Sequence, residues 1–140
     1  MKSKKPNLQQ VAAIPIRHTS AGALEVLLVT SRETRRWVIP KGWPWPKRAD
    51  CDAAAAEAWE EAGVLGRIGP VSVGTFTYDK RANGKHRTLA VAVYVLEVEE
   101  EAEMWPEAPE RRRQWFSPAV ASELVDEPSL KTILLKLAGL

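Results

Sequence analysis

The chain has 140 residues, of which 45% are hydrophobic and 27% are charged, a balance that is ordinary for a soluble globular protein. The formal net charge of +2 is too small to argue on its own for a nucleic-acid or membrane partner. One cysteine excludes an intramolecular disulfide and a cysteine-rich zinc site, so we expect a reducing, cytoplasmic environment.

A chain of this length can bury a hydrophobic core without disulfides or structural metal ions, and we expect a single domain over residues 1–140. Residues 1–8 are basic and polar, and we expect them to form a flexible tail. No apolar stretch follows that tail, so it does not resemble a signal peptide. No run approaches the ~18 apolar residues of a membrane-spanning helix.

In the first half of the chain, two apolar, β-branched runs predict strands at 11–17 and 24–31, separated by a turn-prone segment. Residues 37–40 predict a short strand or strand end, and the proline-rich segment 42–47 predicts a loop. A helix is expected over 52–62, with acidic residues in its first turn and Gly63 at its end.

The second half predicts strands at 71–79 and 87–99, joined by a hairpin turn at residues 82–84. The later strand is apolar on both faces, so we expect it in the middle of the sheet. A helix is expected to begin after residues 116–118. A last helix is expected over 129–138, with a buried stripe of Leu130, Ile133, Leu134 and Leu137. Mixed strands bracketed by helices predict an α/β (α+β) sandwich.

The helix expected at 52–62 has two different sides. Its apolar stripe, which can dock on a sheet, comprises Ala55, Ala58, Trp59 and Ala62. Its other side carries Glu57, Glu60 and Glu61, with no lysine or arginine inside the helix. A solvated acidic face is one explanation. A site for a divalent cation and a phosphate is the other, because Mg²⁺ takes carboxylate and phosphate oxygens and the preceding loop is cationic.

From Gly42 to Val64 the sequence resembles the Nudix box, which runs glycine, five residues, Glu, seven residues, Arg-Glu, apolar, any, Glu-Glu, any, Gly, apolar. Gly42 opens that pattern, and EAWEEAGV at 57–64 closes it with the spacing intact. The preceding WVIPKG at 37–42 resembles the lead-in of Nudix hydrolases that act on dinucleoside polyphosphates and diphosphoinositol polyphosphates. Residues 105–107, Arg112 and residues 115–116 also look like that branch.

The sequence departs from the box at two positions. The family's first glutamate falls on Arg48, and its arginine falls on Ala56. In the family these two residues usually support one another and help orient the glutamate at the position of Glu57. Their joint replacement leaves no orphaned charge. Arg48 is then open to pairing with Asp50 or Asp52, or to contacting substrate phosphate.

The resemblance implies a Nudix-type α-β-α sandwich with a mixed central sheet. It also implies metal-dependent hydrolysis of a diphosphate linkage in a nucleoside-diphosphate-X substrate, with dinucleoside polyphosphates and diphosphoinositol polyphosphates favoured. Mg²⁺ or Mn²⁺ would be held by Glu57, Glu60 and Glu61, and Glu57 or Glu60 would be the catalytic base. A helping carboxylate from a later loop is expected within the acidic stretch 97–103. We expect a small phosphorylated substrate and a monomer or homodimer.

Basic and glycine positions around the box are candidates for binding the phosphates, because arginine contacts phosphate bidentately and lysine adds a point charge. These substrate-binding candidates are Arg32, Arg36, Lys41, Gly42, Arg48, Lys85 and Arg87. A solvated basic surface is the competing explanation for each group. The arginines at 111–113 are expected to flank a helix start, with a role in binding phosphate as the alternative.

Two alternatives to an enzyme stay open. One is a Nudix-fold nucleotide-binding or regulatory module that has lost turnover, which Ala56 favours and the three retained glutamates disfavour. The other is an incidental acidic helix in an interaction protein. That hypothesis predicts that Mg²⁺, Mn²⁺ and nucleotides leave the thermal stability unchanged, whereas a ligand that binds the folded state raises it.

Overall fold

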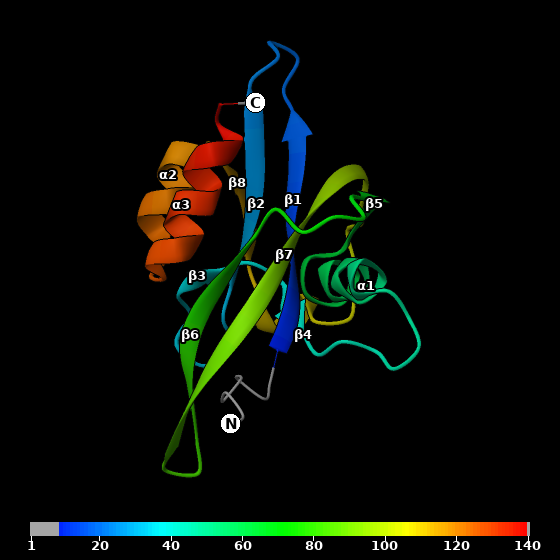
Figure 1. Cartoon of the computed structure of the whole chain (residues 1–140). Helices are drawn as coiled ribbons and strands as arrows, with labels where there is room; N and C mark the ends of the chain where they lie inside the picture. Colours follow the sequence, from blue (N-terminus) through cyan, green and yellow to red (C-terminus); the bar gives the residue numbers. More distant parts are fainter. Residues whose placement is uncertain (1–8, 140) are drawn as a thin grey trace.

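A computed structural model describes residues 9–139 of the chain, so the expected tail at 1–8 lies outside the described residues. It shows an eight-stranded sheet with helices on both faces (Figure 1). The elements are β1 (Gln9–His18), β2 (Leu24–Thr30), β3 (Trp37–Val38), β4 (Lys41–Gly42), α1 (Asp50–Ala62), β5 (Val64–Ile68), β6 (Gly74–Ala82), β7 (Lys85–Glu101), the 3₁₀ helix η1 (Ala108–Glu110), β8 (Arg113–Phe116), α2 (Pro118–Leu124) and α3 (Pro128–Leu137).

The sheet is mixed. Its main strand order is β3-β2-β1-β7-β5, while β4 pairs with β1, β6 with β7 and β8 with β2. β1 and β7 run parallel, from Gln9 opposite Ala90 to Ile16 opposite Glu97. The other pairs are antiparallel. β7 therefore lies at the centre of the sheet, which confirms the position predicted from its two apolar faces.

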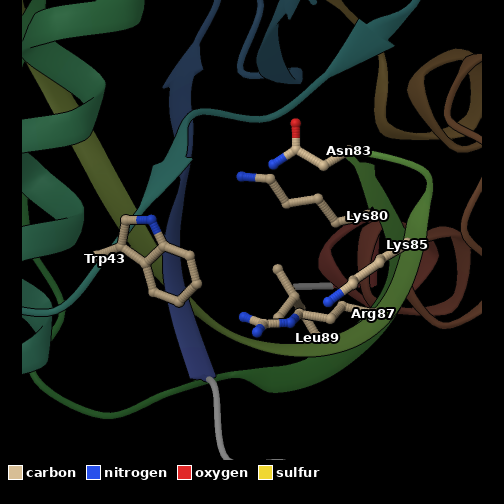
Figure 2. Close-up of a pocket in the computed structure, with 6 residues that line it drawn as sticks. All are labelled: Trp43, Lys80, Asn83, Lys85, Arg87 and Leu89. Atoms are coloured by element: carbon tan, nitrogen blue, oxygen red, sulfur yellow. The ribbon is translucent and has the colours of Figure 1, made fainter.

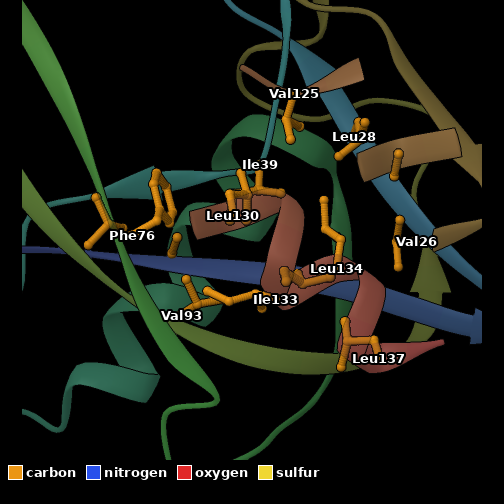
Figure 3. Close-up of a cluster of buried hydrophobic side chains, with 14 residues drawn as sticks. Val26, Leu28, Ile39, Phe76, Val93, Val125, Leu130, Ile133, Leu134 and Leu137 are labelled. Carbon is orange, nitrogen blue, oxygen red and sulfur yellow. The ribbon is translucent and has the colours of Figure 1, made fainter. Parts of the chain in front are cut away.

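Two hydrophobic cores form because successive residues of a strand point to opposite faces of the sheet. On one face, α2 and α3 pack against residues such as Leu28 and Val93 (Figure 3). On the other face, the alanines of α1 pack against residues such as Val11 and Ala13. The predicted stripe of α3 is buried as expected. The α-β-α sandwich is thus confirmed.

Three strands were not predicted: β4, β5 and β8. β5 lacks a continuous apolar run that would predict a strand, and in the structure only its first residue is buried. Its pairing with β7 also shifts register between Leu65 and Gly66. β8 is only four residues long and directly follows two arginines. The expectation that residues 111–113 flank a helix start is wrong, because Arg113 begins β8 and the next helix begins at Pro118.

Helix α1 begins two residues earlier than expected and meets the sheet through a different face. Its buried residues are Ala53, Ala54, Ala58, Glu61 and Ala62. Trp59 of the predicted stripe is only half-buried, and Glu61 is only 8% exposed. Placing all three glutamates on the outer side of the helix was therefore wrong for Glu61. The helix ends at Gly63, which adopts the left-handed conformation (φ 68°) that glycine tolerates best.

Across residues 9–139, none of the helices combines the length and apolar character that crossing a membrane requires.

Candidate functional site

Two of the predicted glutamates lie against the strand-and-loop segment that precedes α1. The backbone N–H of Lys41 donates to Glu61 Oε1 at 3.3 Å. Gly42 faces Glu57 so closely that a Cβ at position 42 would lie 2.9 Å from Glu57 Cγ and nearer still to its carboxyl group. The absence of a side chain at Gly42 therefore makes the space that the Glu57 carboxylate occupies.

Burial sets the electrostatics of this pair. Burial raises the pKa of Glu61 to about 7, with the Arg111 guanidinium opposing that shift and the charge of Glu57 adding to it. Burial also raises the pKa of Glu57. The charge of Glu60 adds to that shift, and a hydrogen bond with the Glu61 side chain opposes it. Two neighbouring carboxylates whose charged forms are disfavoured in this way are stabilised by a nearby cation.

The donor set fits a divalent cation held by two carboxylates. Mg²⁺ commonly takes one or two protein carboxylates and fills its other positions with water and phosphate oxygens. Within residues 9–139, no three His, Cys, Asp or Glu side chains come together as a ready-made metal site. The structure brings Glu57 and Glu61 together, while Glu60 is exposed, and the roles of Glu60 as ligand or base remain predictions.

Two residues outside the main site prediction lie beside this pair: Glu107, which was missed, and Arg111, for which a phosphate role was only an alternative. Arg111 Nη2 is 3.6 Å from Glu61 Oε2, and Arg111 Nε donates to Glu107 Oε1 at 2.6 Å. Glu107 is also close enough to raise the pKa of both Glu57 and Glu61. The signal that could have found it is the Trp-Pro-Glu sequence at 105–107.

The acidic stretch at 97–103, where a helping carboxylate was expected, uses three of its carboxylates in other ion pairs, including Glu99, which lies 3.9 Å from Arg67. Glu97 pairs with Arg67 at 2.6 Å, and Glu101 lies within 3.7 Å of both Arg17 and Arg113. The later carboxylate that lies beside the site is thus Glu107, which follows the stretch.

Lys41 links the carboxylates to strand β6. Its Nζ lies 4.7 Å from the centre of the Tyr78 ring, and burial lowers its pKa although Glu61 opposes the shift. Arg36, another predicted substrate-binding residue, donates from Nη2 to Glu127 Oε2 at 2.7 Å. Arg36 and Lys41 line one small pocket together with Glu127, the residue that precedes α3.

A basic groove of about 370 Å³ opens between Trp43 and the β6–β7 hairpin (Figure 2). Its lining residues are Trp43, Lys80, Asn83, Lys85, Arg87 and Leu89. Trp43 stands on one side and the β6–β7 hairpin supplies the cations on the other. Trp43 directly follows Gly42, which packs against Glu57, so one short segment of chain contributes to both the groove and the carboxylate pair. Lys85 and Arg87, both predicted as substrate-binding, meet in it.

Two further predicted substrate-binding residues lie outside the lining of this groove. Arg32 is exposed and lies 3.5 Å from Glu110. Arg48 stacks 5.1 Å from the centre of the Trp45 ring, and among the described residues it forms no ion pair with Asp50 or Asp52. The suggested Arg48–aspartate pairing is absent there, and contact with substrate phosphate remains a prediction for both arginines.

The fold and site together define an α/β domain with paired carboxylates on one helix and a cationic groove lined in part by the residue that follows Gly42. Residues 7–137 match the family model of the NUDIX domain, and the chain belongs to that family.

The chain is also similar in sequence to several diphosphoinositol polyphosphate phosphohydrolases. The chain is 42% identical over 95 residues to a human diphosphoinositol polyphosphate phosphohydrolase 3-alpha, a match covering 66% of this chain and 54% of the relative. It is 43% identical over 95 residues to a diphosphoinositol polyphosphate phosphohydrolase 2 from Rattus norvegicus, covering 66% of this chain and 49% of that one. The chain thus spans about half the length of the curated relatives it matches.

Solved structures share the fold. A C. elegans Ap4A hydrolase in a binary complex matches with a TM-score of 0.68 and 22% identity, covering 94% of this chain and 96% of that chain. The NUDIX domain of Shewanella oneidensis NrtR, in complex with ADP ribose, matches with a TM-score of 0.68 and 17% identity, covering 96% and 90%.

Proposed function

We propose that the chain is a metal-dependent Nudix pyrophosphohydrolase that cleaves a diphosphate linkage in a nucleoside-diphosphate-X type of substrate. The observation that carries the proposal is the pair of Glu57 and Glu61, held against the Lys41–Gly42 strand, with the next residue, Trp43, lining a basic groove. The relatives named as phosphohydrolases, at 42% identity, support it.

In this proposal Glu57 and Glu61 hold Mg²⁺ or Mn²⁺, leaving the remaining positions for water and phosphate oxygens. A bound ion would neutralise phosphate charge and lower the pKa of a water nucleophile. Phosphoryl transfer asks a protein mainly for positioning and charge stabilisation, which the buried carboxylates and the cations of the groove provide. Glu60, one helical turn from Glu57 and exposed, is the candidate to accept the proton of the attacking water.

The groove favours a substrate with several phosphates. Lys80, Lys85 and Arg87 give it three cations, and the ring of Trp43 gives it a flat apolar surface that is 44% exposed. A dinucleoside polyphosphate would place phosphates near the cations and a base against Trp43, since aromatic rings stack on bases. A diphosphoinositol polyphosphate would use the cations alone. Arg32, Arg36, Lys41 and Arg48 remain proposed phosphate contacts.

Mass spectrometry of the products tests the function. Purified protein is incubated with Mg²⁺ and a panel of dinucleoside polyphosphates, diphosphoinositol polyphosphates, nucleotide sugars and nucleoside triphosphates in ¹⁸O-labelled water. We expect Mg²⁺-dependent cleavage of one class, with ¹⁸O on one product phosphate, and loss of that cleavage in Glu61→Gln. Cleavage that Glu61→Gln leaves unchanged would refute the carboxylate assignment. Binding of the panel without any cleavage would favour the non-catalytic module.

A further inference from the structure

The carboxylates of α1 lack a compensating cation within their own helix. Between Asp50 and Ala62 there is no lysine or arginine, and the position where the Nudix box carries arginine is Ala56. Arg48 does not compensate for this, because the structure places its guanidinium over Trp45. The positive charge that faces buried Glu61 must therefore come from another element.

Arg111 supplies that charge from the segment that precedes β8. Its side chain is only 8% exposed, and the Glu61 side chain is 11% exposed. The guanidinium reaches in three directions: to Glu61 Oε2 at 3.6 Å, to Glu107 Oε1 at 2.6 Å, and to the backbone oxygen of Thr30 at 3.0 Å. A planar fork of donors can serve three acceptors at once, which a lysine ammonium at the same place cannot match geometrically.

The segment that carries Arg111 is fixed against α1 and β2 by further hydrogen bonds. The Trp105 indole Nε1–H donates to Glu61 O at 3.0 Å, and the Glu107 N–H donates to Glu60 O at 3.1 Å. On the other side, the Arg112 N–H donates to Thr30 Oγ1 at 2.9 Å. Hydrogen bonds to α1 on one side and to β2 on the other therefore set the position of Arg111 relative to Glu61.

We propose that Arg111 is the positioning residue of Glu61, and that it replaces from outside the helix the arginine that is missing at position 56. The inference rests on the proposed function, in which Glu61 is a metal ligand. Groups that orient a metal ligand without touching the metal commonly contribute 10- to 100-fold to metal affinity. Arg111 fits such a role because its guanidinium contacts the Glu61 oxygen Oε2 while the Lys41 N–H contacts the other, Oε1.

The first arm of the test measures Mn²⁺ affinity by electron paramagnetic resonance. The variants are Arg111→Gln, Arg111→Lys and the matched control Arg112→Gln, whose side chain is exposed and forms no ion pair among the described residues. We expect the Mn²⁺ Kd to rise by about 10- to 100-fold in Arg111→Gln, by less in Arg111→Lys, and not in Arg112→Gln. Wild-type affinity in Arg111→Gln overturns the inference. If that variant does not fold, wild-type affinity in Arg111→Lys overturns the requirement for a guanidinium.

The second arm needs no metal. The Lys41 amide reports on Glu61 because it donates to Oε1. In metal-free protein we expect hydrogen exchange of this amide to accelerate roughly two- to tenfold in Arg111→Gln, the loss expected for one hydrogen bond, and not in Arg112→Gln. An unchanged Lys41 amide would contradict the positioning role. A wild-type protein that binds no Mn²⁺ would refute the proposed function, and the amide measurement still decides the role of Arg111.

Discussion

Alanine at position 42 should separate activity from stability. Gly42 has no left-handed backbone, so alanine adds no backbone strain there. Its Cβ would lie 2.9 Å from Glu57 Cγ and nearer still to Oε2 and Cδ, whereas ordinary contacts are 3.4–4 Å. The Glu57 carboxyl group must therefore move by about 1 Å or more, which is enough to cost roughly 10²-fold in catalysis.

The cost to folding should be small, because the atoms that must move are the end of a flexible, half-buried side chain. We expect Gly42→Ala to lower the free energy of unfolding by no more than about 1 kcal/mol. The Mg²⁺-dependent rate on the best substrate should fall by about 100-fold, and the Mn²⁺ Kd should rise. Urea unfolding, steady-state kinetics and Mn²⁺ titration measure the three quantities.

Gly69→Ala is the matched control. A Cβ there would lie 3.5 Å from the Val95 backbone oxygen, an ordinary contact, and we expect neither rate nor Mn²⁺ affinity to change. A Gly42→Ala protein with the wild-type rate and Mn²⁺ affinity would show that the packing of Glu57 against Gly42 has no part in the site.

Three further predictions concern pH, the groove and the core. The pKa of Glu61 is about 7 in the folded protein against an ordinary 4.5, so between these pH values the metal-free folded state keeps a proton that the unfolded chain releases. The free energy of unfolding of the wild type should therefore fall by of order 3 kcal/mol as pH rises from about 4.5 to 7. Denaturant titrations should find this slope in the wild type and not in Glu61→Gln. Replacing both Lys85 and Arg87 with alanine should raise KM about tenfold or more with little change in kcat, because these cations contact the phosphates equally in the ground state and the transition state. The control variant Lys136→Ala, on α3, should change neither KM nor kcat. Leu134→Ala should lower the free energy of unfolding by about 2–5 kcal/mol, since Leu134 is fully buried between α3 and the sheet, and a loss below 1 kcal/mol would contradict that packing.

The elements that sequence could predict are those with strong local patterns. The alternating and fully apolar runs of β1, β2 and β7 gave strands within a few residues of their observed bounds. The asparagine and glycine of the hairpin turn, both with positive φ, fixed the β6–β7 connection. β5 escaped prediction because its order comes from pairing with β7 rather than from its own residues, with Leu65, Gly66 and Arg67 all exposed.

The site residues likewise divide into those that local sequence could predict and those that depend on the tertiary fold. Glu57, Glu61 and Gly42 could be found because one short segment carries them at fixed spacing. Arg111 and Glu107 could not be placed, because their contact with α1 depends on how the segment between β7 and β8 folds back over the helix, a separation of 50 residues between Arg111 and Glu61. The buried position of Glu61 was missed because alanines on both sides of α1 leave its docking face ambiguous from sequence.

Anomalous diffraction from crystals soaked in Mn²⁺ tests the central claim most directly. We predict a peak at the distance of a first-coordination contact, about 2.0–2.3 Å, from carboxylate oxygens of both Glu57 and Glu61, and loss of that peak in Glu61→Gln crystals. A fully soaked crystal with no peak between those two side chains, or with Mn²⁺ held only elsewhere, would contradict it.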